Sequence, residues 1–242
     1  PASEAPKVLE LYRTLADQAP PELTLVALMR PAPPAPWLPK DMHGKPIVAL
    51  LACHTGSPEE GEKAVAPIKA FGKPIGDVLV RRPYAQMQSL LDATQPKGRR
   101  YYWKSEYLSR IEPALCEKVI EHAARIRSPH SAVILFQIEG ALNQLSEEHS
   151  PVGNRNARYV LNLAGSWEQA GEDAVNVEWA RDAWNDMKSF STGGTYINFL
   201  TEDEGPERIE AALGKGLERL AEIKAKWDPQ NVFRTNRNIK PA

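Results

Sequence analysis

The C-terminal part of the chain contains the stretch that decides the fold: residues 193–200 read GGTYINFL, and residues 220–241 read LAEIKAKWDPQNVFRTNRNIKP. The first stretch is rich in aromatic and β-branched residues and follows two glycines, which predicts a short strand. Side chains point to alternate faces along a strand. Tyr196 and Asn198 are therefore predicted to lie on the same face of that strand.

One long helix is predicted between these stretches, over residues 206–227. Its apolar side chains recur at helical spacing and form a stripe, while charged side chains face water. The stripe consists of Ile209, Leu213, Leu217, Leu220 and Ile223. Asp228 ends the helix, because a residue that precedes a proline is pushed out of the helical region. We expect Asp228 and Asn231 to organise the turn that follows, with Phe233 as a buried anchor.

The rest of the chain shows apolar periodicities of two and of about 3.6 residues, which indicate strands and helices. Strands are predicted over residues 22–29, 45–55, 101–108, 131–138 and 158–167, and helices over residues 4–18, 58–71, 84–93, 112–126 and 173–190. These elements do not follow a strict strand–helix–strand rhythm. We therefore expect an α+β fold, in which helices cover a large, mostly antiparallel sheet. No internal repeat or low-complexity linker divides residues 1–242, which favours one domain.

The composition is that of an ordinary globular protein: of 242 residues, 42% are hydrophobic and 25% are charged. The 30 lysines and arginines are balanced by 31 aspartates and glutamates, giving a net charge of -1. No basic surplus is available to neutralise a phosphate backbone, so we do not expect a nucleic-acid partner. No apolar run approaches the ~20 residues of a membrane span. No signal peptide is seen, which favours a cytoplasmic location.

The usual signatures of an active site are not found in the sequence. It contains no G-x-S-x-G elbow, no P-loop and no H-E-x-x-H pair. The Gly193-Gly194 pair is too short to be a dinucleotide fingerprint. The five histidines are scattered, and the residues beside Cys53 and His54 do not complete a set of metal ligands, so no metal site is predicted. Composition and spacing alone thus define an α+β domain without a stated activity.

The two C-terminal stretches resemble the closing segment of the FAD-linked oxidases similar to berberine bridge enzyme, which are flavoproteins of the vanillyl-alcohol oxidase type. The family pattern is Tyr-x-Asn, a helix, then K-x-K-(Tyr/Trp)-D-P-x-N-(Val/Leu)-F-R and N-I-x-P. The matching residues are Tyr196, Asn198, Lys224, Lys226, Trp227, Asp228, Pro229, Asn231, Val232, Phe233, Arg234, Asn238 and Ile239. Residues 84–88 and 98–104 resemble the family's entry into its substrate domain. The resemblance covers nearly the whole chain, with the closing segment at about residues 192–242.

The sequence departs from the family pattern in two places and lacks one part. Residues 213–217 read LGKGL where the family usually has Tyr-Gly-x-Asn-Tyr, and Glu139 replaces the first glycine of a G-G-A turn. The flavin domain that precedes this region in the family is not found. The resemblance implies that FAD is bound mainly by this missing N-terminal FAD-binding domain, which becomes a partner of the chain. Without that domain the chain is expected to be inactive.

The resemblance also implies roles for individual residues. In the family, FAD accepts hydride from a substrate carbon, and the protein supplies position and a base. Tyr196 is the candidate base and a contact to the flavin edge, with Asn198 as a further flavin contact. Asn162 is the first candidate substrate contact, because plant members carry Gln or Glu five residues before the tryptophan that corresponds to Trp167.

Each of these roles has a plainer structural alternative. Tyr196 would pack in the sheet core with its hydroxyl bonded to backbone, and Asn162 would bond a loop. Arg155 and Glu139 are further candidates for substrate contacts, with a surface ion pair as the alternative for each. The tryptophans Trp103, Trp179 and Trp184 are expected in the core rather than at a cofactor.

The resemblance implies the substrate-binding portion of an FAD-dependent oxidoreductase. Such an enzyme oxidises a small molecule at an alcohol, sugar or similar CH–OH or CH–N centre. The alternative is a non-catalytic binding module that keeps the fold without flavin chemistry, because a fold does not fix a function.

Overall fold

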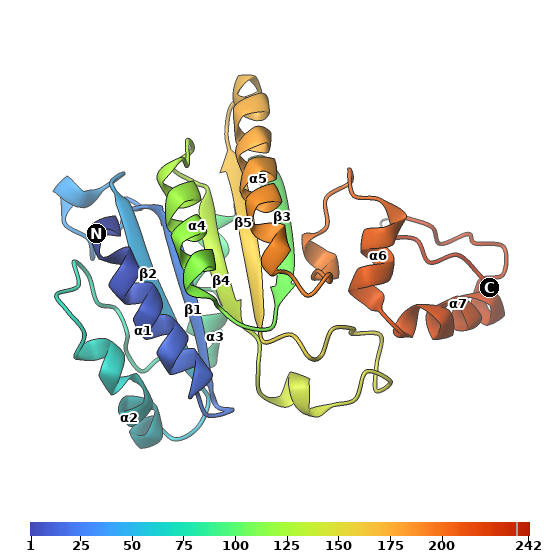
Figure 1. The fold of residues 1–242 in the computed structure, drawn as a ribbon, viewed down its shortest axis with the longest axis horizontal. Helices are drawn as coiled ribbons and strands as arrows, with labels where there is room; N and C mark the ends of the chain where they lie inside the picture. Colours follow the sequence, from blue (N-terminus) through green and yellow to red (C-terminus); the bar gives the residue numbers. More distant parts are fainter. Residues whose placement is uncertain (236) are drawn as a thin grey trace.

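A single five-stranded sheet forms the centre of the molecule, in a computed structural model that describes residues 1–235 and 237–242. The strands lie in the order β2-β1-β4-β5-β3, and all four neighbouring pairs are antiparallel (Figure 1). Their bounds are β1 Leu23–Pro31, β2 Pro46–His54, β3 Arg100–Leu108, β4 Ala132–Gln137 and β5 Tyr159–Trp167. The predicted α+β fold with an antiparallel sheet is therefore confirmed.

Three helices pack side by side over one face of this sheet (Figure 1). They are α1 Ala5–Asp17, α4 Pro113–Ala124 and α5 Asp173–Met187. The other helices are α2 Pro58–Lys69, α3 Tyr84–Gln88, α6 Pro206–Leu213 and α7 Gly216–Trp227. Ser57 and Glu60 close a capping box that fixes the start of α2. The predicted helix over residues 84–93 is shorter than expected, since α3 ends at Gln88.

The main core lies between the sheet and these three helices. Alternate residues of β5 point into it, and Tyr159, Leu161 and Leu163 are almost completely buried there. The hydroxyl of Tyr12 on α1 donates a hydrogen bond to the carbonyl of Leu135 at 3.0 Å, which satisfies a polar group that burial would otherwise penalise. The core therefore fixes the sheet from one side.

The intervening residues of the strands point to the opposite face, which we call the far face. The strand register aligns Asn162 of β5 with Ser105 of β3 and Ile134 of β4, so these three side chains share that face. The far face is defined here by Val26, Leu28, Trp103, Ser105, Tyr107, Ile134, Phe136, Val160 and Asn162. It is the sheet surface left for a site.

Two predicted elements near the C-terminus are wrong. Residues 195–200 are not a strand; they contain a single 3-10 turn over Ile197–Phe199. The long helix over residues 206–227 is broken into α6 and α7, because Gly214 has a φ of 53° and a ψ of -134°, which no helix contains. Apolar periodicity continues across this break and so could not reveal it.

The break between α6 and α7 allows us to predict whether one mutation raises or lowers the free energy of unfolding. Gly214→Ala should lower the free energy of unfolding by about 1–3 kcal/mol, because a Cβ disfavours this backbone conformation. In a continuous helix the same change would instead raise it by about 1 kcal/mol. Urea unfolding of the variant distinguishes the two, and Lys215→Ala, at a neighbouring exposed position with negative φ, is the control.

Candidate functional site

Aromatic side chains gather on the far face around Phe199, which lies in the 3-10 turn. The ring centroid of Phe199 is 5.1 Å from that of Tyr196, 5.4 Å from that of Trp103 and 6.2 Å from that of Phe136. The first two pairs meet edge to face, the arrangement that aromatic rings favour. This aromatic cluster joins residues from two strands and the C-terminal segment into one mostly apolar group.

Tyr196 lies at the rim of the aromatic cluster, with 37% of its surface exposed. The expected strand is absent, so the two predicted residues do not share a strand face. The turn brings them together in another way: the Asn198 side-chain amide donates a hydrogen bond of 2.7 Å to the Tyr196 hydroxyl. The prediction of a shared strand face is therefore wrong, and the two side chains are neighbours through this hydrogen bond instead.

Two buried donors of the far face have no hydrogen-bond partner within the described residues. They are Nδ2 of Asn162, which is 2% exposed, and Nε1 of Trp103. A buried donor without a partner costs roughly 1–3 kcal/mol, so such groups in a folded protein point to water or a bound molecule. Trp103 was expected in the core; it lies instead on the far face, beside the aromatic cluster.

Tyr107 is a second phenol at this place, and the sequence reading did not single it out. Burial, and next the neighbouring Tyr196, raise the pKa of Tyr107 to about 12. Tyr107 therefore keeps its proton at neutral pH and is not a base there. The position of Tyr107 on the far face follows from the strand register, in which Tyr107 is paired with Val160.

The side chains of Arg155 and Glu139 bond to other residues of the connection between β4 and β5. The Arg155 guanidinium is buried and donates to the Leu142 carbonyl at 2.8 Å and to the Ser150 hydroxyl at 2.6 Å. Glu139 accepts two hydrogen bonds from Arg158, the longer at 2.9 Å. Neither side chain bonds Tyr196 or Asn162 in the described part of the chain. These bonds give Arg155 and Glu139 an evident role in folding this connection.

Buried charges on the other side of β3 hold the C-terminal segment, and sequence reasoning missed them. Lys104 and Glu106 are 5% and 2% exposed and point away from the far face, on either side of Ser105. Glu106 pairs with Arg208 of α6 at 2.8 Å, and Lys104 pairs with Glu204 at 3.3 Å. We call these four residues the charged clamp. Arg208 also pairs with Glu204 at 2.9 Å, which closes it.

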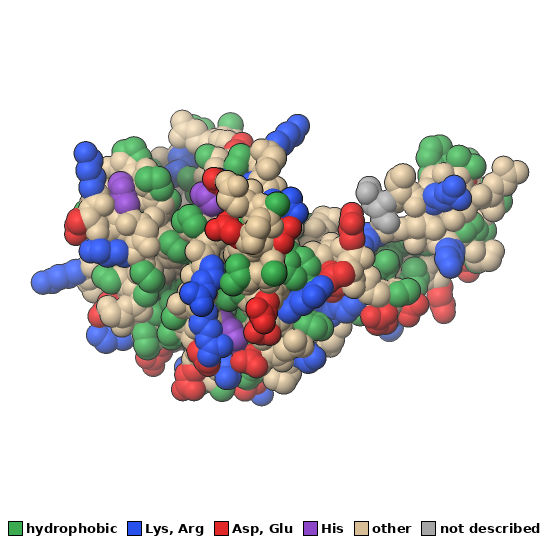
Figure 2. All heavy atoms as spheres, turned by 90° about the horizontal axis from the view of Figure 1, so that it is seen from above, with side chains coloured by type: hydrophobic (Ala, Val, Ile, Leu, Met, Phe, Trp, Pro, Cys, Tyr) green, Lys and Arg blue, Asp and Glu red, His purple; other side chains and the backbone are tan. Residues whose placement is uncertain are grey.

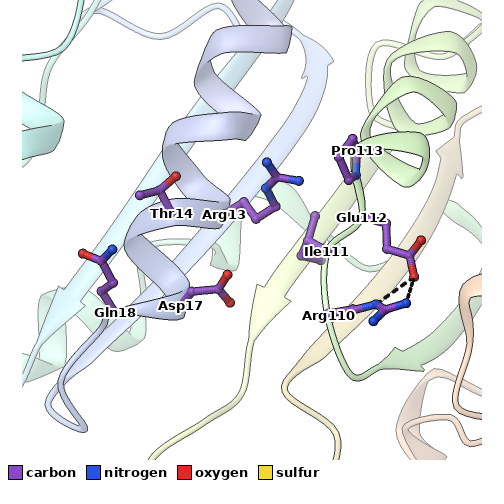
Figure 3. A pocket seen from close by; sticks show the side chains of 8 residues that line it. All are labelled: Arg13, Thr14, Asp17, Gln18, Arg110, Ile111, Glu112 and Pro113. Atoms are coloured by element: carbon purple, nitrogen blue, oxygen red, sulfur yellow. Dashed lines mark hydrogen bonds and ion pairs between the residues drawn. The ribbon is translucent and has the colours of Figure 1, made fainter.

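Two shallow hollows lie elsewhere on the surface. One lies between α1 and the start of α4, where Arg110 pairs with Glu112 (Figure 3). Its other lining residues are Arg13, Thr14, Asp17, Gln18, Ile111 and Pro113. It is polar and belongs to the helix-covered side of the sheet, so it is separate from the far face.

The second hollow lies between α7 and the C-terminal tail, which project away from the sheet (Figures 1 and 2). Phe233, expected as a buried anchor, is 80% exposed, and Trp227 is 76% exposed. The predicted turn is present, since the Asp228 carboxylate accepts bonds from the N–H groups of Val232 and Phe233. This segment therefore has a fixed turn but presents its apolar side chains to solvent.

Comparisons with known proteins show which proteins the chain is similar to. Residues 195–240 match the family model described as "Berberine and berberine like". The chain is 24% identical over 196 residues to an FAD-linked oxidoreductase of Dictyostelium discoideum, which covers 80% of this chain and 42% of that protein. The chain is similar to the berberine bridge enzyme-like FAD-linked oxidoreductases.

Solved structures with the same fold agree with this similarity. Berberine bridge enzyme in complex with (S)-reticuline matches with a TM-score of 0.80 at 15% identity, over 100% of this chain and 53% of that one. A berberine bridge enzyme-like protein of Physcomitrella patens matches with a TM-score of 0.77 at 19% identity, over 99% and 52%. The chain thus shares the fold of about half the length of these relatives.

The far face carries hydrogen-bond donors of the kind that a flavin ring uses. A flavin ring has carbonyl and nitrogen acceptors along one edge. Asn162 and Trp103 offer buried donors without partners among the described residues, and the aromatic cluster beside them is mostly apolar. Within residues 1–235 and 237–242, no group of three or more His, Cys, Asp or Glu side chains is placed to hold a metal ion. None of the helices described there is long and apolar enough to cross a membrane.

The pKa of Glu204 in the charged clamp allows a prediction of how the stability of the chain depends on pH. Burial opposes ionisation of Glu204, but the hydrogen bond from Arg208 and the charge of Lys104 outweigh it and hold the pKa of Glu204 below its usual value. A carboxylate with a lowered pKa in the folded state stabilises the fold above the unfolded value of about 4.3, and this contribution is lost as pH falls further. The melting temperature should therefore drop between about pH 5 and pH 3.

Comparison with Glu204→Gln isolates this contribution. The variant starts from a lower melting temperature at pH 6, because Lys104 and Arg208 each lose one carboxylate partner, and its drop toward pH 3 should be shallower. Parallel curves for the two proteins would contradict this source of acid sensitivity.

Proposed function

We propose that the far face binds the substrate of an FAD-dependent oxidoreductase and presents it to the flavin. The substrate is a small molecule oxidised at a CH–OH or CH–N centre of an alcohol, sugar or related compound. The observation that supports this proposal is the pair of unpartnered buried donors, Asn162 Nδ2 and Trp103 Nε1, on the same face as Tyr196. Bound FAD would supply the hydride-accepting chemistry.

Tyr196 is the proposed base. Oxidation of an alcohol removes a proton from oxygen as the carbon gives up hydride, and a side chain within hydrogen-bond reach takes that proton. The exposed Tyr196 hydroxyl accepts a hydrogen bond from the Asn198 amide, which orients it at the rim of the aromatic cluster. Asn162 has no acidic proton to exchange, so its proposed role is to orient a substrate acceptor group.

The rest of FAD is proposed to be held by a part of the protein outside these 242 residues. No dinucleotide fingerprint for its diphosphate is found in the sequence. The exposed apolar side chains of α7 and the tail, including Trp227 and Phe233, are the proposed contact with that part. Apolar patches of this kind commonly mark interaction sites.

Kinetics of flavin reduction test the two main roles in a protein that joins these residues to its FAD-binding part. Tyr196→Phe should slow flavin reduction by ~10²–10⁴-fold, because the base is removed while the ring remains. Asn162→Ala should instead raise the apparent dissociation constant of the substrate with a smaller change in rate. Stopped-flow absorbance over a range of substrate concentrations measures both quantities.

Tyr101→Phe is the matched control and should leave the reduction rate unchanged. Tyr101 lies in β3, is exposed, and donates its hydroxyl hydrogen bond to the Pro96 carbonyl. An unchanged rate in Tyr196→Phe would remove this residue from the role of base. A joined protein that takes up no FAD would favour the non-catalytic binding module.

The division of the FAD site between two parts makes a further prediction. The 242-residue chain alone should bind FAD weakly or not at all, because it offers groups for the flavin ring but no fingerprint for the diphosphate. Titration of the isolated chain with FAD, followed by flavin fluorescence, measures this. A tight one-to-one complex would contradict the proposed division.

A further inference from the structure

We propose that Lys104 and Glu106 are positioning residues that hold both ends of the Tyr196 segment, and that Glu106 controls the rate of flavin reduction through Tyr196. The inference rests on the proposed function of Tyr196 and extends it to residues on the opposite side of β3. The two buried charges flank Ser105 in sequence, while Ser105 itself points to the far face. One strand therefore carries the anchors on one face and the site on the other.

The upstream end of the segment is attached to Glu106. The Glu106 carboxylate accepts hydrogen bonds from the Ser191 hydroxyl and from Nε1 of Trp184, the latter at 2.6 Å. The Ser191 hydroxyl in turn accepts the N–H of Gly193 at 2.9 Å. Glu106 thereby fixes the start of the segment that leads to Tyr196.

Backbone pairing continues this attachment along the edge of β3. Tyr107 donates its N–H to the Gly194 carbonyl and accepts the N–H of Thr192, each at 2.9 Å. The Thr195 and Ser105 hydroxyls then lie 2.6 Å apart, one residue before Tyr196. The phenol of Tyr196 thus follows directly after a stretch bonded to β3.

The downstream end is attached to Lys104. Its ammonium group lies 3.2 Å from the Thr201 hydroxyl, 3.4 Å from the Asp203 carboxylate and 3.3 Å from the Glu204 carboxylate. Residues 196–200 therefore form a short bridge between two attached ends.

Arg208 couples the two ends. It bonds Glu106, Glu204 and the Ser105 carbonyl, the last at 2.9 Å. A change at either end is therefore transmitted to the other. Because a small misplacement of a catalytic group can cost about 10²-fold in rate, loss of one anchor should act through the position of Tyr196.

A double-mutant cycle in the FAD-containing, joined protein tests this inference. Glu106→Gln keeps the shape of the side chain but removes its charge. It should slow flavin reduction by about 10–10²-fold at saturating substrate. The dissociation constant of the substrate should change by less than about twofold. In the Tyr196→Phe background, Glu106→Gln should cause no further slowing, because the residue through which it acts is gone.

Two further variants distinguish a loss of positioning from a general loss of stability. Trp179→Phe removes a buried 2.9 Å hydrogen bond to the His122 carbonyl on the helix side, and should lower the melting temperature without slowing flavin reduction. Ser191→Ala removes one hydrogen bond to Glu106 but keeps the ion pair between Glu106 and Arg208, and should slow reduction in the same non-additive way if Glu106→Gln does not fold.

The outcomes separate the inference from the function on which it rests. Full additivity of Glu106→Gln and Tyr196→Phe, or an unchanged rate in both Glu106→Gln and Ser191→Ala, would overturn the positioning role. If the wild-type flavin is not reduced by any alcohol, sugar or amine, or if Tyr196→Phe alone has no effect, the proposed function itself fails.

Discussion

The two-residue alternation of side chains along β3 and β5 is the constraint on which the rest of the structure depends. In β5 it sends Tyr159, Leu161 and Leu163 into the helix-covered core and leaves Asn162 on the far face. A shift of register by one residue would exchange these sets and bury the asparagine among leucines. The core and the candidate site are therefore specified by the same pairing.

Strand β3 shows the same constraint with charges in place of leucines. It is an edge strand, so one side of it has no neighbouring strand in the sheet. The segment that ends in Thr195 bonds Ser105 and Tyr107 on that side and so covers the C-terminal part of the edge, which would otherwise invite wrong pairing. Lys104 and Glu106 then secure the segment from the helix side. The proposed positioning of Tyr196 and the cover of this edge thus use the same contacts.

Much of the fold could be predicted from the sequence because its elements are local. The strand at Tyr159–Trp167 and the helix at Ala5–Asp17 are set by periodicity within one stretch of chain, and both were expected within one residue of their observed bounds. The break at Gly214 was missed because it depends on one backbone conformation and leaves the apolar spacing intact. Exposure of Phe233 was missed because its apolar character does not show whether other parts of the fold cover it.

The candidate site could be predicted only in part, for a similar reason. The family pattern indicated Tyr196 and Asn198, but nothing local places Trp103 beside Phe199 or raises the pKa of Tyr107. The charged clamp is the clearest case, since Arg208 bonds a carbonyl 103 residues earlier in the chain. Single charged residues on a strand or helix are normally read as solvated surface, and only the folded chain shows that these are buried.

The buried charges of the clamp raise the question of why ion pairs are found where apolar packing would give enough stability. An ion pair removed from water gains little net free energy, because desolvation offsets much of the attraction. A buried ion pair does fix the relative positions of its members. All hydrogen bonds of the Glu106 carboxylate are made only when Arg208, Trp184 and Ser191 are each at hydrogen-bond distance. Apolar contacts tolerate sliding, whereas a buried carboxylate that loses a donor is strongly penalised. A group that takes a proton from a substrate, the role proposed for Tyr196, requires the second kind of constraint.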